Sequence, residues 1–324
     1  MSMPPPETRP PRAMLTVGGA APLFAGLCAL ATLCSLVAAV AFAQPESEWV
    51  HYRRLDVESP WGTQRVLVTF PRLGGHREHP PGERYPIVVA LHGRGEAQQG
   101  PERGYLGWTT RYGLPDHFGA LMRGRLYASD YRGYVREAHL DAVNASLRER
   151  PFRGLMVVTP YIPDVGREGV ASERLAEIGD WLSGPLLEAV RERFDGAART
   201  REGTSIDGIS LGGRVALTVG FAHPEVFGVV GGMQPAIRGD EAALASRALE
   251  AAEVQPQRIR LLSSEEDPFL EATRALSRAL GERHVTHRLT VVPGPHDYGF
   301  NRGPAGIEML YFHDRALARE PLPE

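Results

Sequence analysis

Residues 204–213 read Thr-Ser-Ile-Asp-Gly-Ile-Ser-Leu-Gly-Gly, and an apolar run continues from there to Ala222. The first six residues form a short, partly β-branched run next to glycine, and such a run predicts a buried strand. Residues 211–222 repeat apolar and small side chains at helical spacing, which predicts a helix. The small residues of this run, among them Gly212 and Gly220, would let the helix lie close to a sheet. The segment therefore predicts a strand that turns directly into a helix at Ser210.

Residues 208–212 match the pattern Gly-x-Ser-x-Gly, in which a serine occupies the sharp turn between a strand and a helix. Such a turn exposes the serine hydroxyl, so Ser210 is a candidate nucleophile. The five residues alone are weak evidence, because a chain with 36 glycines can produce the pattern by chance. The strand and helix predicted on either side supply the context that the chemistry needs.

The rest of the chain has the same alternation of short β-branched runs and longer amphipathic runs, which indicates an α/β fold with a mostly parallel central sheet flanked by helices. With 43% hydrophobic residues, the chain can fill the core of one such domain over residues 44–324. The runs that predict strands are 65–70, 85–91, 155–160, 204–209, 227–231, 258–263 and 286–292. The runs that predict helices are 173–194, 211–222, 241–252, 268–280 and 304–318.

The stretch from about 94 to 154 has no clean period, and it is rich in Gly, Pro, Arg and Tyr. We therefore expect an irregular insertion above the sheet, which forms either a lid or binding wall, or a purely structural flap. Its arginines could receive an anionic ligand and its tyrosines could stack on sugars or aromatic acids, or both could simply pack the flap. The arginines are Arg103, Arg111, Arg123, Arg125, Arg132 and Arg136, and the tyrosines are Tyr105, Tyr112, Tyr127, Tyr131 and Tyr134.

Composition excludes several kinds of chemistry. All 36 basic residues are arginine, so a Walker A loop, a Schiff-base lysine and a Ser–Lys dyad are impossible. A net charge of −3 without a long basic block argues against nucleic-acid binding. Both cysteines, Cys28 and Cys34, precede residue 44, so the expected domain has no thiol for catalysis or metal binding. We expect no metal, since the His-x-x-His spacings at 76–79 and 284–287 lack a metal-binding context.

The first 43 residues predict export. Arg9 and Arg12 precede an uncharged run that ends in Ala41-Phe42-Ala43, a typical signal-peptide cleavage pattern. Residues 23–43 are also long and apolar enough to span a bilayer, so an uncleaved N-terminal membrane anchor is the alternative. In both cases the positive charge precedes the segment, and we expect residues 44–324 to be periplasmic or secreted. Contact with the membrane is expected only through this segment, if it is uncleaved.

A serine nucleophile needs a base within hydrogen-bond reach and a carboxylate that orients the base. Asp267 follows the predicted strand 258–263, and His296 follows the predicted strand 286–292. Carboxyl ends of neighbouring parallel strands meet at one edge of a sheet, and Ser, Asp, His is the α/β-hydrolase chain order. Asp267 could instead cap a helix, and His296 could be a turn residue. The alternatives are Glu265, Glu266 and Asp240 for the acid, and His287 and His284 for the base.

An acyl-transfer site also needs N–H donors for the oxyanion. The backbone N–H of Leu211, directly after the serine, is one candidate. The loop Leu91-His-Gly-Arg-Gly95 follows a predicted apolar strand and is similar to the His-Gly loop of esterases, so the N–H of Gly93 or Arg94 is the other candidate. We expect His92 to be structural.

Three segments together carry a family resemblance: residues 185–194, the turn at 208–213, and residues 222–232. They resemble the esterase family that includes esterase D, enterochelin esterases, feruloyl esterases and mycolyltransferases, with similarity over roughly 64–318. The resemblance implies an α/β-hydrolase fold and cofactor-free serine esterase or acyltransferase chemistry. It places Ser210, Asp267 and His296 on the catalytic triad. One departure is Met233-Gln-Pro-Ala, where the family commonly has a Ser-Gly pair, and this puts the substrate class in doubt.

The residues and the resemblance together predict an exported serine hydrolase that cleaves carboxylic esters through an acyl-enzyme. The expected substrate is a small-molecule, glycan or lipid ester. One alternative is an acyltransferase of the mycolyltransferase type, in which a hydroxyl group replaces water. A second is a non-catalytic envelope binding protein that keeps the fold, and a weaker third is a peptidase.

Overall fold

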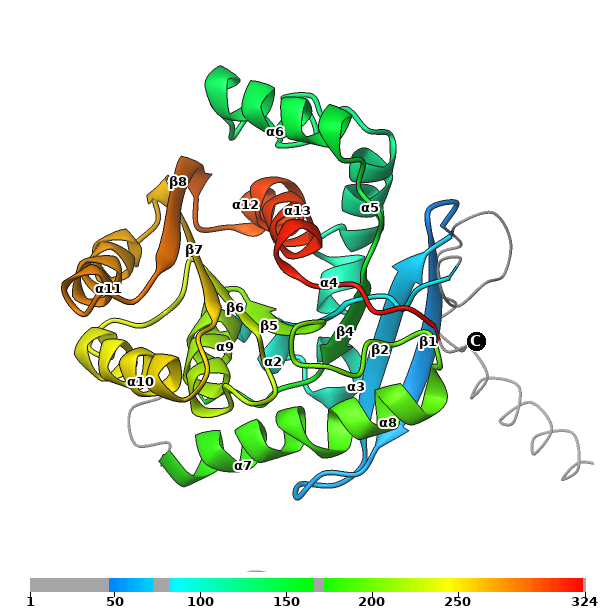
Figure 1. Ribbon diagram of the computed structural model, residues 1–324, viewed down its shortest axis with the longest axis vertical. Helices are drawn as coiled ribbons and strands as arrows, with labels where there is room; N and C mark the ends of the chain where they lie inside the picture. Colours follow the sequence, from blue (N-terminus) through cyan, green and yellow to red (C-terminus); the bar gives the residue numbers. More distant parts are fainter. Residues whose placement is uncertain (1–46, 73–81, 166–171, 323–324) are drawn as a thin grey trace, which may run out of the picture. The chain divides into compact units, whose positions relative to one another are not determined.

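The computed structural model describes residues 47–72, 82–165 and 172–322, which fall in one compact unit. Within these residues eight strands form one sheet in the order β1-β2-β4-β3-β5-β6-β7-β8 (Figure 1). β1 pairs antiparallel with β2, β2 pairs antiparallel with β4, and the other neighbours are parallel. This confirms the predicted mostly parallel α/β sheet. The strands are β1 (Val50–Val57), β2 (Gln64–Pro71), β3 (Ile87–Leu91), β4 (Met156–Pro160), β5 (Thr204–Gly208), β6 (Val229–Met233), β7 (Arg258–Glu266) and β8 (His287–Pro295).

Helices cover both faces of the sheet (Figure 1). Those of the insertion are α2 (Arg94–Ala97), α3 (Pro101–Gly104), α4 (Gly107–Thr110), α5 (Leu114–Met122) and α6 (Glu137–Glu149). Those after β4 are α7 (Ser172–Ser183), α8 (Pro185–Arg193), α9 (Leu211–Ala222), α10 (Glu241–Val254), α11 (Leu270–Glu282), α12 (Tyr298–Phe300), the π-helical turn η1 (Asn301–Ala305) and α13 (Gly306–Ala316).

The central strand β3 shows how the two cores are divided. Its alternate residues Ile87 and Val89 pack with side chains of α7 to α11, while Val88 and Ala90 pack with side chains of the insertion and α13. All four side chains are fully buried, as expected for a strand that is covered on both faces. The insertion is therefore part of the second core layer, and it does not stand free above the sheet.

The insertion is helical, and the expectation that it would be irregular is wrong. Three of its helices, α2 to α4, have only four residues each, and glycines such as Gly100 and Gly113, with positive φ angles of 76° and 75°, separate successive helices. These interruptions hide the helical period in the sequence. Buried aromatic side chains, including Trp108 and Phe118, then fix the short helices on the sheet.

Other elements also differ from the expectations. β1 was not predicted, because its sequence Val-His-Tyr-Arg-Arg-Leu-Asp-Val belongs to a partly exposed edge strand and carries several charges. The helix expected over 173–194 is two helices, since Gly184 and Pro185 interrupt it. β7 and β8 each continue three residues beyond their predicted ends, which brings Asp267 and His296 directly after the last residues of two paired strands.

Some expectations fall on residues that the structure does not describe. The predicted signal peptide or anchor, residues 1–43, is among them, as are His76 and His79. Among the described residues, no helix combines the length and apolarity needed to span a bilayer. The division at residue 43 and export therefore stay predictions.

Candidate active site

Ser210 lies between the last residue of β5 and the first residue of α9, on the predicted sharp turn. Its φ of 56° and ψ of −115° are strained for a residue with a side chain. A Cβ at Gly212 would lie 2.5 Å from the carbonyl oxygens of Leu91 and His92, and a Cβ at Gly208 would overlap the backbone of Gly212. The two glycines of the motif are therefore required by close backbone packing, and Ser210 is the residue that the turn presents.

The structure brings Ser210, His296 and Asp267 into one hydrogen-bonded chain. His296 Nε2 lies 3.1 Å from Ser210 Oγ, and His296 Nδ1 lies 2.9 Å from Asp267 Oδ1. The three residues follow β5, β7 and β8 at the carboxyl edge of the sheet. Because an ionised carboxylate can only accept, Nδ1 carries the hydrogen, and Nε2 is left to accept from the serine hydroxyl. This arrangement can transfer a proton from serine to imidazole.

The side chain of Asp267 is buried and fully engaged. Its Oδ1 also accepts from the N–H of Phe269 at 3.0 Å, and its Oδ2 accepts from Ser263 Oγ at 2.5 Å. The ring of Phe269 packs against the His296 ring, with centroids 5.4 Å apart. Asp267 therefore accepts from the chain that leads into α11, as a capping residue would, and also holds the imidazole. The capping contact and the contact with the imidazole are therefore both present.

The alternative acids and bases lie elsewhere or hold other partners. Glu265 pairs with Arg136 and Asp240 pairs with Arg214, whereas Glu266 is exposed. His287 Nε2 lies 2.7 Å from Ser277 Oγ, and His284 is exposed at a positive φ of 56°.

The candidate oxyanion donors divide into two groups. Leu211 and Arg94 are the first residues of α9 and α2, where a backbone N–H has no acceptor within its own helix. The N–H of Gly93, in contrast, donates to Tyr112 Oη at 2.9 Å. Gly93 is therefore already bonded in this structure, which speaks against its expected role as a donor, and Arg94 and Leu211 remain the candidates.

His92 is buried and has a structural role in this loop, as expected. Its Nδ1 lies 2.9 Å from the carbonyl oxygen of Gly93, and its Nε2 accepts from the N–H of Ile162 at 3.1 Å. Burial lowers the pKa of His92 to about 4, so the ring is neutral at pH 7. It ties the loop after β3 to the chain that leaves β4.

A buried carboxylate that the sequence does not predict lies directly behind this loop. Glu96 accepts from the hydroxyls of Tyr112 and Tyr298, the latter at 2.9 Å, and its Oε1 lies 3.3 Å from Arg111 Nε. Glu96 is only 1% exposed. The one signal in the sequence is an acidic residue three positions after Gly93. Its partners are 15 to 202 residues away, and no local pattern predicts them.

The polar side chains of the insertion mostly serve the fold. Arg111 and Arg136 pair with Glu96 and Glu265, and Arg123 pairs with Asp130 at 2.7 Å. Tyr105, Tyr112 and Tyr131 are buried, whereas Tyr127 is 51% exposed. These contacts favour the packing role over a ligand-binding role for the paired arginines and the buried tyrosines.

The departure from the family pattern at Gln234 has a clear structural role. Gln234 is buried at a positive φ of 42°, directly after β6. Its Nε2 donates to Ser264 Oγ at 2.6 Å and to the carbonyl oxygen of Pro295 at 2.9 Å. The side chain thus links β6, β7 and the residue that precedes His296.

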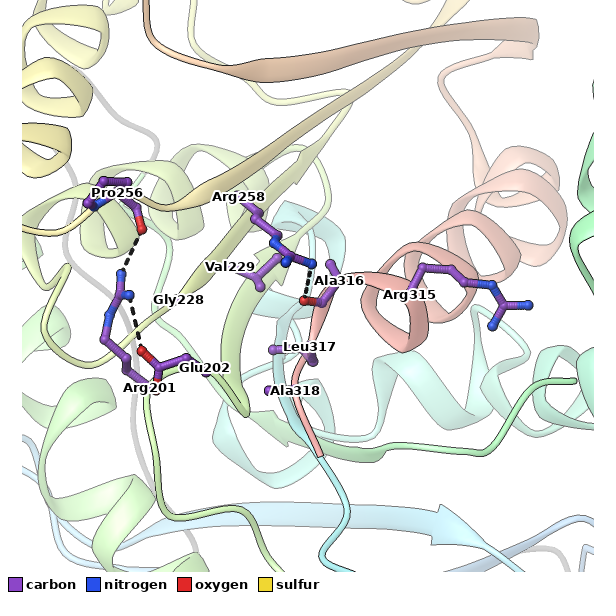
Figure 2. Close-up of a pocket in the computed structure, with 10 residues that line it drawn as sticks. All are labelled: Arg201, Glu202, Gly228, Val229, Pro256, Arg258, Arg315, Ala316, Leu317 and Ala318. Carbon is purple, nitrogen blue, oxygen red and sulfur yellow. Dashed lines mark hydrogen bonds and ion pairs between the residues drawn. The ribbon is translucent and has the colours of Figure 1, made fainter. Parts of the chain in front are cut away.

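The pocket shown in Figure 2, with a volume of about 230 Å³, lies at the amino-terminal ends of β6 and β7, away from the edge that carries Ser210. Arg201 donates to the carbonyl oxygen of Pro256 at 3.1 Å, and Arg258 donates to that of Ala316 at 2.7 Å. The guanidinium group of Arg315 points away from both. The arginines drawn in Figure 2 hold chain segments together, and we assign this pocket no part in the site.

No protein-family model and no curated protein sequence matches the chain. Solved structures match it, among them a ferulic acid esterase with 16% identity and a TM-score of 0.58, over 83% of this chain and 98% of that one. The chain has the α/β-hydrolase fold. An S-formylglutathione hydrolase from Staphylococcus aureus matches with 13% identity and a TM-score of 0.51, over 83% of this chain and 98% of that chain. A ferric enterobactin esterase from Salmonella typhimurium matches with 18% identity and a TM-score of 0.52, over 84% of this chain and 60% of that chain.

Proposed function

We propose that this α/β-hydrolase-fold protein is a serine hydrolase that cleaves carboxylic esters. The observation that carries the proposal is the hydrogen-bonded chain from Ser210 through His296 to Asp267, with distances of 3.1 and 2.9 Å. Similarity of fold to ferulic acid esterase, S-formylglutathione hydrolase and ferric enterobactin esterase supports the same reaction class. A small-molecule, glycan or lipid ester is the proposed substrate class.

In the proposed mechanism, Ser210 Oγ attacks the ester carbonyl while His296 Nε2 takes the hydroxyl proton. Asp267 holds the ring in the required tautomer and stabilises the imidazolium that forms. The N–H groups of Arg94 and Leu211 donate to the oxyanion of the tetrahedral intermediate. His296 then protonates the leaving alcohol, and an acyl group remains on Ser210. Water, deprotonated by His296, releases the carboxylic acid and restores the serine.

The proposal is tested by turnover of simple aryl esters with purified residues 44–324. Ser210→Ala should lower kcat by about 10⁴-fold or more, because it removes the atom that forms the acyl-enzyme. Ser205→Ala is the matched control: this serine lies five residues earlier on β5 and bonds to the carbonyl oxygen of Ile87. Its kcat should stay within about 3-fold of wild type, since Ser205 has no part in the proposed chemistry. Equal rates for Ser210→Ala and wild type would exclude the proposed nucleophile.

We also propose that the domain is exported, on the strength of residues 1–43. The full chain expressed in a bacterial host should yield a product outside the cytoplasm whose N-terminus, read by mass spectrometry, is Gln44 if the segment is cleaved. An uncleaved product in the membrane fraction would assign the segment as an anchor. A full-length soluble product in the cytoplasm would contradict export.

A further inference from the structure

The carboxylate of Glu96 connects α2 to two other segments, which lie 16 and 202 residues away in the sequence. It lies on α2, directly after the loop with the proposed oxyanion donor Arg94. It accepts from the hydroxyls of Tyr112, in the insertion, and of Tyr298, on α12. Tyr298 comes two residues after His296. One buried side chain thus joins the oxyanion loop, the insertion and the segment with the proposed base.

Tyr112 extends the connection to the backbone of the oxyanion loop. Its hydroxyl donates to Glu96 and, through the same oxygen, accepts from the N–H of Gly93 at 2.9 Å. Tyr112 is 1% exposed and packs edge-on against Trp108, with centroids 5.1 Å apart, so its position is fixed by the core. The Gly93 N–H is therefore anchored to a rigid side chain one residue before Arg94.

The loop residue Gly93 and the helix α2 need such an anchor because this segment has little stability of its own. α2 contains four residues, and Gly93, the residue before it, has no side chain with which to cap it. An isolated helical turn of this length is unstable in water, so tertiary contacts must set the position of its first N–H groups. Tyr298 also packs closely on the loop, since a Cβ at Gly95 would lie 2.6 Å from its hydroxyl.

We propose that Glu96 and Tyr112 are positioning residues that hold the Arg94 N–H in place relative to Ser210 and His296; this inference rests on the proposed function. Oxyanion donors act only within a narrow distance from the developing charge. A displacement of about 1 Å in such a group can lower the rate by about 10²-fold. The loss of either side chain should therefore affect the transition state much more than the binding of substrate.

The test compares Tyr112→Phe and Glu96→Gln with Tyr131→Phe. Tyr131 is a close control, because it is also buried in the insertion and donates to a buried glutamate, Glu308, at 2.8 Å. For aryl-ester hydrolysis, Tyr112→Phe and Glu96→Gln should lower kcat by about 10- to 100-fold with KM within about 2-fold. Tyr131→Phe should keep kcat within about 2-fold, although it loses a comparable hydrogen bond.

A second measurement does not depend on activity. Amide hydrogen exchange over residues 91–97 should be faster in Tyr112→Phe than in wild type, because the Gly93 N–H has lost its acceptor, and it should be unchanged in Tyr131→Phe. If wild type hydrolyses no ester, the proposed function fails, and this exchange comparison alone decides whether the anchor exists. Equal kcat in Tyr112→Phe and Tyr131→Phe, or unchanged exchange over 91–97 in Tyr112→Phe, would overturn the inference.

Discussion

The backbone of Ser210 is strained in the position that presents its side chain. With φ at 56° and ψ at −115°, it adopts a conformation that glycine tolerates and that other residues adopt at a cost of about 1–3 kcal/mol. Glycine itself costs about 0.5–1 kcal/mol in chain entropy. We therefore expect the free energy of unfolding of Ser210→Gly to be about 1 kcal/mol higher than that of Ser210→Ala, so the glycine variant should be the more stable one. Urea denaturation of the two inactive variants measures this difference, and a less stable glycine variant would argue against strain at the turn.

A buried histidine makes the fold sensitive to acid. Burial lowers the pKa of His117 from 6.5 to about 4, so the unfolded chain binds a proton between these values and the folded chain does not. Stability therefore falls as the pH drops from 6.5 to 4. His117→Leu removes this titrating group. Between pH 7 and pH 5, the loss in the free energy of unfolding should therefore be about 1–2 kcal/mol smaller in His117→Leu than in wild type. Equal losses in the two proteins would show that His117 does not titrate in this way.

The sequence predicts the proposed nucleophile, acid and base because each carries a local signal. Ser210 lies in a short motif, and Asp267 and His296 follow strands whose apolar residues are easy to recognise. The tyrosines behind the oxyanion loop carry no such signal. Tyr112 and Tyr298 contact Glu96 only because the insertion and α12 fold against the same loop. Long-range pairings of this kind depend on the complete fold.

A buried ion pair and a buried hydrogen bond join β5, β7 and α13. Asp207 on β5 accepts from Arg260 on β7 at 2.6 Å and from His313 on α13 at 2.8 Å. All three side chains are buried. Burial acts to raise the pKa of Asp207, but the Arg260 guanidinium and the His313 hydrogen bond outweigh it, and the net shift is downward. The carboxylate is therefore charged and depends on its partners.

Removal of one partner should be costly. We expect Arg260→Met to lower the free energy of unfolding by about 3–5 kcal/mol, because it leaves a buried carboxylate without its cation. Arg258→Met is the control, since Arg258 is exposed on the same strand and bonds to the carbonyl oxygen of Ala316. The free energy of unfolding of Arg258→Met should stay within about 1 kcal/mol of that of wild type. Similar urea midpoints for the two variants would contradict the assigned role of the pair.

The strands that are predicted from the sequence are those with a recognisable run of apolar or β-branched residues. The central strands β3 (Ile-Val-Val-Ala-Leu) and β4 (Met-Val-Val-Thr-Pro) are mostly apolar runs, so their sequences reveal them. β1 lies at an edge and carries three charged residues, and α2, α3 and α4 of the insertion, with four residues each, are too short to display a period. These elements are specified by their neighbours more than by their own sequence.

Glu308 joins the insertion to the C-terminal helix α13. It is buried, and its Oε1 accepts from Tyr131 at 2.8 Å and from His139 at 2.7 Å. The hydrogen bond to Glu308 raises the pKa of His139, against the opposing effect of burial. A raised pKa means that the contact stabilises the fold at pH below 6.5 and loses this effect as the pH rises through the value in the folded protein.

Glu308→Gln should therefore cost more at low pH than at high pH. We expect its free energy of unfolding to lie about 1–3 kcal/mol below that of wild type at pH 5.5, and the gap to narrow at pH 9. Chemical denaturation of both proteins at the two pH values measures the gap. A gap that widens with pH would show that the His139 contact does not work as described.

The nucleophile is identified by the site at which a fluorophosphonate reacts with the folded protein. Trypsin releases residues 202–214, which contain both Ser205 and Ser210. Fragmentation by mass spectrometry should place the adduct on Ser210 in wild type, with none on Ser205 and no labelling of the Ser210→Ala protein. A folded wild-type protein that stays unlabelled at Ser210, or a Ser210→Ala protein that labels equally well, would contradict the claim that this turn presents an activated nucleophile.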